Sequence, residues 1–303
     1  SLGIVVVFYV VGIAGPFALD ILRVLTGITG PVGPRGITPV QPPVGFTVPV
    51  SLTSGSCVGK IVDGMCHGTL QHPLGTNKRL QDVLVATVDS TQSAMYVATV
   101  AATLAAPVGV GVGTAAAYFG GRVDQLLMRY VDLQLVIPPF FVYLFVQVFL
   151  GRSYVLLVAL FGLLNWGSLA RLVRSEALSK TDLGYMRAAE DAGSSSLRTI
   201  RHHLLPNVSN TVVTGVTSMI PMVILVEVAL AYVQLSSPVR ASWGGMISGA
   251  SIMGAGSVVI DGFAFVTWWT EIVPVIAMLS VILACWVTPS ETFSIRRRRE
   301  NDE

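Results

Sequence analysis

Charge is the scarcest property of this sequence. Only 12% of the 303 residues are Asp, Glu, Lys or Arg, whereas soluble domains average about 25%. Hydrophobic residues make up 52% of the chain, and the mean hydropathy is +0.70. This composition excludes an ordinary soluble domain and indicates a polytopic membrane protein. The net charge of +2 is also too small to suggest a nucleic-acid partner.

Catalytic and nucleotide-binding patterns are also missing. The stretch GSCVGKI at 55–61 resembles a phosphate-binding loop, but its Gly spacing is wrong and no Ser or Thr follows Lys60. The sequence has no HExxH helix, no evident Ser/His/Asp set and no evident pair of catalytic carboxylates. The adjacent His202 and His203 point to different faces of a helix, which makes them poor joint ligands. We therefore expect no catalytic site and no cofactor in this chain.

Long apolar runs are what the sequence has in abundance. A helix needs about 20 apolar residues to cross a bilayer, and six segments are long enough. They lie at about 2–19, 93–118, 130–150, 154–172, 212–233 and 269–288. We predict an all-α polytopic membrane protein with about six transmembrane helices. No charged region or clear cleavage site flanks the first run, so we interpret it as a transmembrane helix with its cytoplasmic lead-in missing, not a signal peptide.

Basic residues predict the orientation in the membrane. Twelve of the 19 Lys and Arg residues fall on the side that holds both termini and the shorter loops. Cytoplasmic loops carry such an excess, so we predict that both termini are cytoplasmic. The resulting regions are a first transmembrane helix at 1–19, an extracytoplasmic loop at 20–91, a membrane core at 92–289 with a cytoplasmic insert at 174–210, and a basic tail at 290–303.

The long outer loop is rich in Gly and Pro, which excludes a continuous helix or a central strand. Cys57 and Cys66 both lie in this loop, and an outer location permits a disulfide. The pair is either a disulfide or two free thiols. A metal site of these cysteines with His67 and His72 matches no standard ligand spacing, so we expect none. Cys285, in the last apolar run, is interpreted as a small buried residue.

A polar stretch, Tyr185–Asn207, interrupts the apolar sequence on the cytoplasmic side. The hydroxyl and acid at Ser179–Asp182 resemble a helix start, Gly193 a left-handed helix end, and Pro206 a helix break. These signals predict two short helices joined at a glycine, at about 182–191 and 197–205. Ala188 and Ala189 lie mid-helix, where small side chains allow close approach. The insert is either a docking element for a cytoplasmic partner or an amphipathic helix resting on the membrane.

The polar residues of the apolar runs are costly in lipid and are therefore candidates for function. Glu227 and Asn165 are our candidates for lining a pathway. The alternatives are a structural hydrogen bond or a protonated acid at Glu227, and a bridge between helices at Asn165. Other positions have packing roles: Gly109, Gly111 and Gly113 allow close helix contact, and Pro138 and Pro139 kink the third span.

The stretch AAEDAGSSSLRTIRHHLLPN resembles the EAA loop of the permease subunits of ATP-binding-cassette importers. Other elements resemble the C-type permeases of the dipeptide, oligopeptide and nickel branch, in family order: HPLGT at 72–76, YFGGRVDQLLMRYVDLQLVIPPF at 118–140, WGSLARLVRSEALS and SWGGM. The resemblance covers about 71–274. Arg187 stands where the family has the Glu that names the motif, and the outer loop up to about Leu70 has no counterpart.

The resemblance implies a transport subunit of a prokaryotic plasma membrane. The residues expected to couple it to ATPases are Tyr185, Arg187, Ala188, Ala189, Gly193, Ile200, Leu205 and Pro206. The implied partners are a second similar permease, two cytoplasmic ATPase subunits that hold ATP and Mg, and an extracytoplasmic binding protein. Di- or oligopeptides are the expected substrates, with nickel or a small sugar as alternatives. A self-sufficient carrier or channel, or a non-transporting scaffold, is the alternative class.

Overall fold

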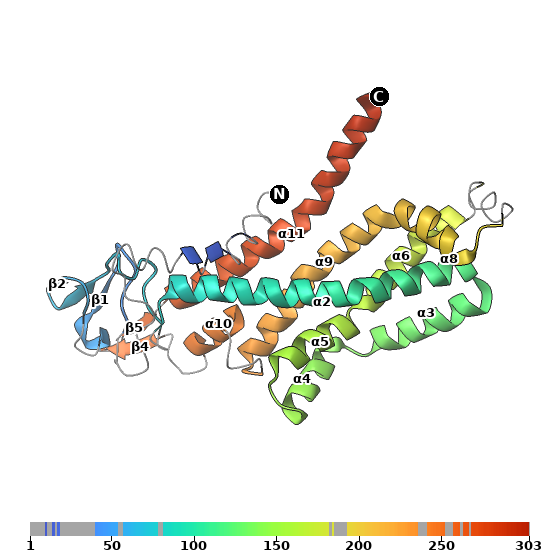
Figure 1. Ribbon diagram of the computed structural model, residues 1–303. Helices are drawn as coiled ribbons and strands as arrows, with labels where there is room; N and C mark the ends of the chain where they lie inside the picture. Colours follow the sequence, from blue (N-terminus) through green and yellow to red (C-terminus); the bar gives the residue numbers. More distant parts are fainter. Residues whose placement is uncertain are drawn as a thin grey trace. The chain divides into compact units, whose positions relative to one another are not determined.

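Helices make up most of the chain that the computed structural model describes (Figure 1). The described residues are 10, 14–15, 17–18, 40–53, 57–77, 81–181, 184, 193–235, 241–251, 257–260, 263–266 and 268–302. The predicted first transmembrane helix at 1–19 therefore lies mostly outside them. The chain divides into two compact units, residues 1–96 with 227–288 and residues 97–226 with 289–303.

Candidate membrane spans match four of the predicted apolar runs. Three stretches are long and apolar enough to cross a membrane: α2 (Val83–Phe119), α5 with α6 (Tyr154–Leu164 and Trp166–Thr181), and the stretch Ser196–Tyr232 that ends in α9 (Leu205–Tyr232). A fourth is the bent pair α3 (Gly121–Val136) and α4 (Pro139–Phe149). The last predicted run is the apolar start, Trp269–Cys285, of α11 (Trp269–Asp302). The described residues thus hold three or four candidate spans, and the number six stays a prediction.

The predicted kink at Pro138 and Pro139 is confirmed. Helix α3 ends at Val136, α4 begins at Pro139, and their axes differ by 67°. Proline lacks an N–H and excludes the helical conformation from the residue before it. Pro138 accordingly has extended backbone angles (φ −62°, ψ 117°), while Pro139 occupies the first helical position, where its missing N–H costs nothing.

Two predicted helix signals are wrong. Ser179 does not cap a new helix, because α6 continues to Thr181 and the Ser179 hydroxyl donates back to the Glu176 carbonyl. The predicted helix start at Asp182 itself lies outside the described residues. Pro206 does not break a helix. The chain stays helical from Ser196 to Tyr232, because a π-helical turn just before Pro206 widens the helix at that point.

Small residues bring α2 against α6 in the unit of residues 97–226. A Cβ added at Gly113 would lie 2.5 Å from the Ala170 carbonyl oxygen, and one at Gly109 2.9 Å from the Trp166 carbonyl oxygen. One added at Gly111 meets no atom within 4 Å among the described residues. The predicted close packing is therefore confirmed for Gly109 and Gly113, whose four-residue spacing places both on one helix face, and is wrong for Gly111.

The unit of residues 1–96 and 227–288 contains short strands, so the fold is mostly helical and the predicted all-α class is corrected. One antiparallel sheet has the order β1 (Thr47–Pro49), β3 (Met65–His67), β2 (Ile61–Val62). Pro49 lies on an edge strand, where no ladder hydrogen bond is lost. The remaining elements are the short helices η1 (Val50–Thr53) and α10 (Trp243–Ser251), and the hairpin of β4 (Ser257–Ile260) and β5 (Phe263–Val266).

Candidate coupling site

Half of the predicted coupling residues belong to the described chain. Tyr185, Arg187, Ala188 and Ala189 lie outside the described residues. Gly193, Ile200, Leu205 and Pro206 are described, and all four belong to the unit of residues 97–226. They follow one another over Gly193, α8 (Ser196–Thr199), the π-turn η2 (Ile200–Leu204) and the start of α9.

Gly193 has the left-handed backbone that its sequence context predicts. Its φ is +78°, a value that L-amino acids with a side chain rarely adopt. An added Cβ meets nothing within 4 Å among the described residues. Glycine is therefore favoured at this position by its backbone conformation, and not by lack of space for a side chain.

The second part of the insert is anchored in the hydrophobic core. Leu204 and Val208 are fully buried and belong to a cluster with Ala117 of α2 and with Val173 and Ala177 of α6. Ile200 and Leu205 are partly buried against the same cluster. Two of the predicted coupling residues, Ile200 and Leu205, thus pack between the insert and the hydrophobic core and do not form the outer surface of the insert.

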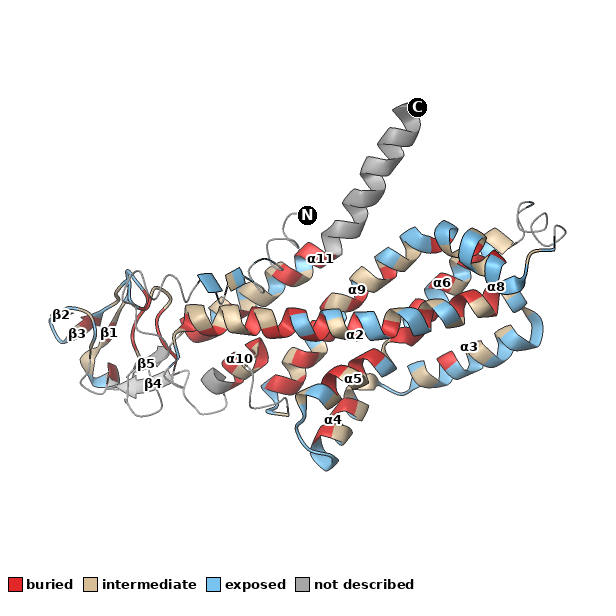
Figure 2. Cartoon of the chain, in the orientation of Figure 1, coloured by how far each residue is buried: buried red, intermediate tan, exposed pale blue. Residues whose placement is uncertain are grey.

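The outer surface of the insert is basic and carries one large apolar side chain. Leu197 is 76% exposed, and its exposed neighbours include Arg198, Arg201 and His202. Pro206 is exposed as well. Figure 2 shows this alternation as pale blue and red bands around α8 and the start of α9. The arrangement offers a protein or lipid surface a positively charged face around a leucine.

Polar contacts hold α3 against α6 beside this anchor. Arg174 forms a two-pronged ion pair with Asp124, each N–O distance being 2.5 Å, and both side chains are partly buried. Arg171 pairs with Asp132 in a more exposed position. The Gln134 side-chain amide donates to the Leu164 carbonyl at 3.0 Å, at the C-terminal end of α5. None of these residues was predicted from the sequence, although the opposite charges within 121–136 and 166–181 were a usable signal for the two ion pairs.

The two pathway candidates are both engaged within the chain. The Asn165 amide donates to the Tyr143 hydroxyl at 2.7 Å and to the Phe161 carbonyl at 2.8 Å. Tyr143 is fully buried, so this bond ties α4 to the end of α5. The Glu227 side chain is 4% exposed. Burial of this kind favours a structural hydrogen bond over exposure to a pathway.

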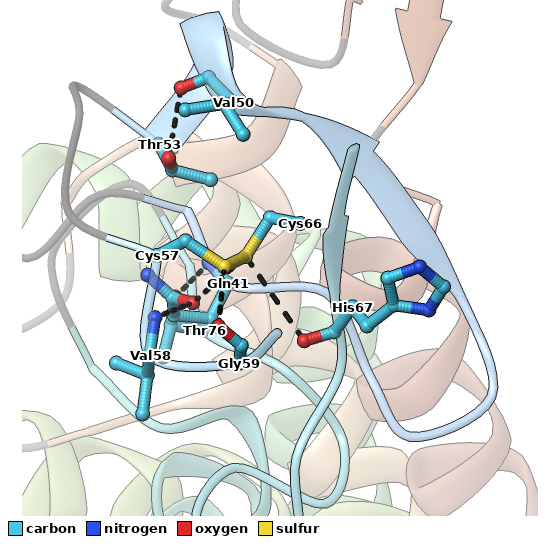
Figure 3. Close-up of a disulfide and its surroundings, with 9 residues drawn as sticks. All are labelled: Gln41, Val50, Thr53, Cys57, Val58, Gly59, Cys66, His67 and Thr76. Atoms are coloured by element: carbon cyan, nitrogen blue, oxygen red, sulfur yellow. Dashed lines mark hydrogen bonds between the residues drawn. A yellow bond between two sulfur atoms is a disulfide. The ribbon is translucent and has the colours of Figure 1, made fainter. Parts of the chain in front are cut away.

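The outer loop contains a disulfide between Cys57 and Cys66 (Figure 3). Their Cα atoms are 5.7 Å apart, within the normal range for a bridge. Gln41 lies beside it: its side-chain oxygen accepts a hydrogen bond from the Val58 N–H at 3.1 Å, and its main chain exchanges two hydrogen bonds with Thr76. Of the two alternatives that the sequence left open, the structure contains the disulfide.

The outer loop is also tied to two helices of its own unit. Asp82 caps α2 by accepting from the N–H groups of Leu84 and Val85, and its second oxygen lies 2.9 Å from His72 Nδ1. The Trp269 indole at the start of α11 donates to the Thr76 carbonyl at 3.2 Å. Because Thr76 also bonds Gln41, these contacts connect the disulfide-bridged loop to the N-terminal ends of α2 and α11.

The described helices, with three or four candidate membrane spans, and the core-anchored polar insert define a helical membrane protein. A family profile described as binding-protein-dependent transport system inner membrane component matches residues 108–288. The chain belongs to this family. Its members are the permease subunits of ATP-binding-cassette transporters, which are transport components and not enzymes.

Individual relatives are similar over the same region. The chain is 28% identical over 178 residues to the oligopeptide transport system permease protein OppC of Bacillus subtilis, and 29% identical over 176 residues to the dipeptide transport system permease protein DppC of that species. The match covers 58% of this chain in both comparisons, and 58% and 55% of the two relatives, so the chain spans little more than half their length. It is 32% identical to OppC of Mycobacterium tuberculosis over 223 residues, or 71% of each chain.

Proposed function

We propose that this chain is one of two transmembrane permease subunits of an ATP-driven importer, forms half of its pathway, and receives the force of ATP binding through the insert. The observation that carries the proposal is the helix that runs unbroken from Ser196 into the fifth span and is anchored at its start by Leu204 and Val208. A push on the insert would therefore rotate α9 as a stiff body, with no loop to absorb the motion.

Gly193→Val tests this coupling. Valine is strained at φ +78° by about 1–3 kcal/mol, so the turn that aims the insert should open. We expect substrate-stimulated ATPase activity of the purified complex to fall while the yield and gel-filtration profile stay unchanged. Gly151→Val is the matched control, because Gly151 also has a positive φ (+92°) and no atom within 4 Å of an added Cβ. It lies on the predicted outer side, away from the insert.

The expected result is uncoupling in Gly193→Val alone. Equal ATPase stimulation in both variants and in the wild type would contradict the proposal. A matching loss in both variants would show that backbone strain anywhere in the chain is harmful, which also removes the argument for the insert.

The complex that we propose has four further kinds of component. They are a second similar permease, two cytoplasmic ATPase subunits, which bind the ATP and Mg, a binding protein outside the membrane, and the surrounding lipid bilayer. The family description, with its reference to a binding protein and an inner membrane, supports this assembly. Native purification of the tagged chain should recover the ATPases and the second permease, whereas recovery of the chain alone would favour a self-sufficient carrier.

Short peptides are the substrates that we propose, because the similar proteins are named for oligopeptide and dipeptide transport. Nickel and small sugars are the alternatives within the same machinery. Mass spectrometry of the ligand carried by the associated binding protein distinguishes the three. We also propose the prokaryotic plasma membrane as the location, with both termini cytoplasmic, which a reporter fused after Glu303 can test.

Glu227 and Asn165 remain our candidates for residues near the pathway. Glu227→Gln keeps the shape of the side chain and removes its charge. If the charge meets substrate, uptake should fall with little change in stability. If Glu227 only makes a structural hydrogen bond, as its burial favours, uptake and ATPase rates should stay at the wild-type level.

A further inference from the structure

The π-turn of the insert shifts the rotational phase of the helix. Downstream of it, the buried positions are four or seven residues apart, as in an α-helix: Leu204, Val208, Gly215 and Met219. Upstream, the buried Thr199 lies five residues before Leu204. Five is the spacing of a π-turn, and the Leu205 N–H correspondingly donates to the Ile200 carbonyl.

An ordinary α-helix would face a different residue toward the core. With 3.6 residues per turn, the position seven before Leu204 returns to the same face. That position is Leu197, which is 76% exposed in the structure, whereas Thr199 is fully buried. The extra residue of the π-turn therefore turns α8 by about 100° relative to α9. This rotation moves a leucine outward and a threonine inward.

Pro206 is the residue that favours the wide turn. In an α-helix its ring would collide with the carbonyl of His202, four residues earlier, and it has no N–H to offer that carbonyl. Pro206 is exposed, so core packing does not explain its position. The chain remains helical through it, with the π-turn on its N-terminal side.

We propose that Pro206 is a positioning residue: it holds the π-turn, and the π-turn fixes the rotational phase in which the insert presents Leu197 and hides Thr199. The importance of this phase for ATPase coupling rests on the proposed function. The existence of this phase does not rest on the proposed function, and it can be measured without any ATPase.

The experiment measures thiol labelling in the full chain. Leu197→Cys and Thr199→Cys are made in a Cys285→Ser background, in which Cys57 and Cys66 are bridged. Vesicles that lack the ATPase subunits are labelled with a maleimide from the cytoplasmic side. We expect Cys at 197 to label much faster than Cys at 199. In Pro206→Ala the turn can close to an α-helix, and the order of reactivity should reverse.

A one-residue deletion provides the rescue. Removing the exposed His202 in the Pro206→Ala background makes an α-helix with positions 199 and 204 four residues apart, so the original phase should return. We expect fast labelling at 197 again, and ATPase coupling that is lost in Pro206→Ala and restored in the deletion. A merely structural role for Pro206 does not predict rescue by a deletion.

Three results would overturn the proposal. Pro206→Ala with unchanged labelling means that the proline does not hold the turn. If the labelling order reverses in Pro206→Ala but the deletion of His202 does not restore it, a change in the rotational phase of the helix is not the cause. If Pro206→Ala, Pro206→Ser and the deletion all fail to fold while the cysteine variants fold, Pro206 serves folding and not phase. Reversed labelling with intact ATPase coupling would support the role of Pro206 in holding the π-turn, but would refute a role of the rotational phase in coupling.

Discussion

The contact between α2 and α6 makes a sharp prediction about three glycines of one helix. Gly113 faces main-chain and Cβ atoms of α6: an added Cβ would lie 2.5 Å from the Ala170 oxygen and 2.9 Å from the Val173 Cβ. None of these atoms can move without moving the helix. Gly111, two residues earlier, faces open space among the described residues. Gly113→Ala should therefore destabilise the chain, and Gly111→Ala should not.

The magnitude follows from these distances. Carbon and oxygen atoms prefer about 3.5 Å or more, so α2 must shift by roughly an ångström to admit the methyl group at Gly113. Overpacking of this kind costs about 1–3 kcal/mol. At Gly111 the methyl group instead gains up to about 1 kcal/mol of helix propensity. The two variants should differ by about 1–4 kcal/mol, or about 2–15 °C in melting temperature.

The buried thiol of Cys285 provides the assay. It is the free cysteine of the described chain and is 2% exposed, so a fluorogenic thiol dye reports unfolding of the detergent-solubilised protein. Gly109→Ala, with its Cβ 2.9 Å from the Trp166 oxygen, should melt between the other two. Equal melting temperatures for the Gly113 and Gly111 variants would refute the packing argument.

Three other experiments test the remaining contacts. Arg174→Ala should lower the unfolding free energy by about 1–2 kcal/mol, since a shielded two-pronged ion pair is lost, while Arg171→Ala, in an exposed pair, should cost less than about 1 kcal/mol; the same thermal assay ranks them. Reducing the Cys57–Cys66 bridge should lower the stability of the β1-β3-β2 sheet by about 2–3 kcal/mol, which is measured as faster proteolysis between these residues. An unchanged rate of proteolysis would argue against a stabilising bridge. A double-mutant cycle of Asn165→Ala and Tyr143→Phe should give a coupling energy of about 1 kcal/mol, and additive effects would exclude the hydrogen bond.

The features that could be predicted from the sequence are those set by local chemistry. The bend at Pro138 and Pro139 and the left-handed turn at Gly193 follow from the covalent structure of proline and glycine. The start of α5 at Tyr154 agrees with the predicted apolar run because Ser153 caps it. The apolar runs of α2 and α9 were located correctly, although both helices begin earlier than hydrophobicity alone indicates.

The features that were missed depend on contacts far apart in the sequence. The helix survives Pro206 because Thr199, just before the π-turn, and Leu204, its last residue, are both held in the core. Arg174 and Asp124 are 50 residues apart, so their charges indicate possible pairing but not the partner. The first half of the insert lies outside the described residues, and its docking role therefore stays a prediction.

The bond from Trp269 to Thr76 has a consequence for the order of events during synthesis. It joins residues 193 positions apart. Translation of the segment between them takes roughly 10–40 s at typical rates. The Cys57–Cys66 bridge spans nine positions, so the small sheet can form as soon as its own strands have been synthesised and the bridge has closed. The connection to α11 must wait for the last helix. The loop can therefore fold early and is joined to α11 late, and a chain truncated before Trp269 would carry a bridged loop that is held by α2 alone.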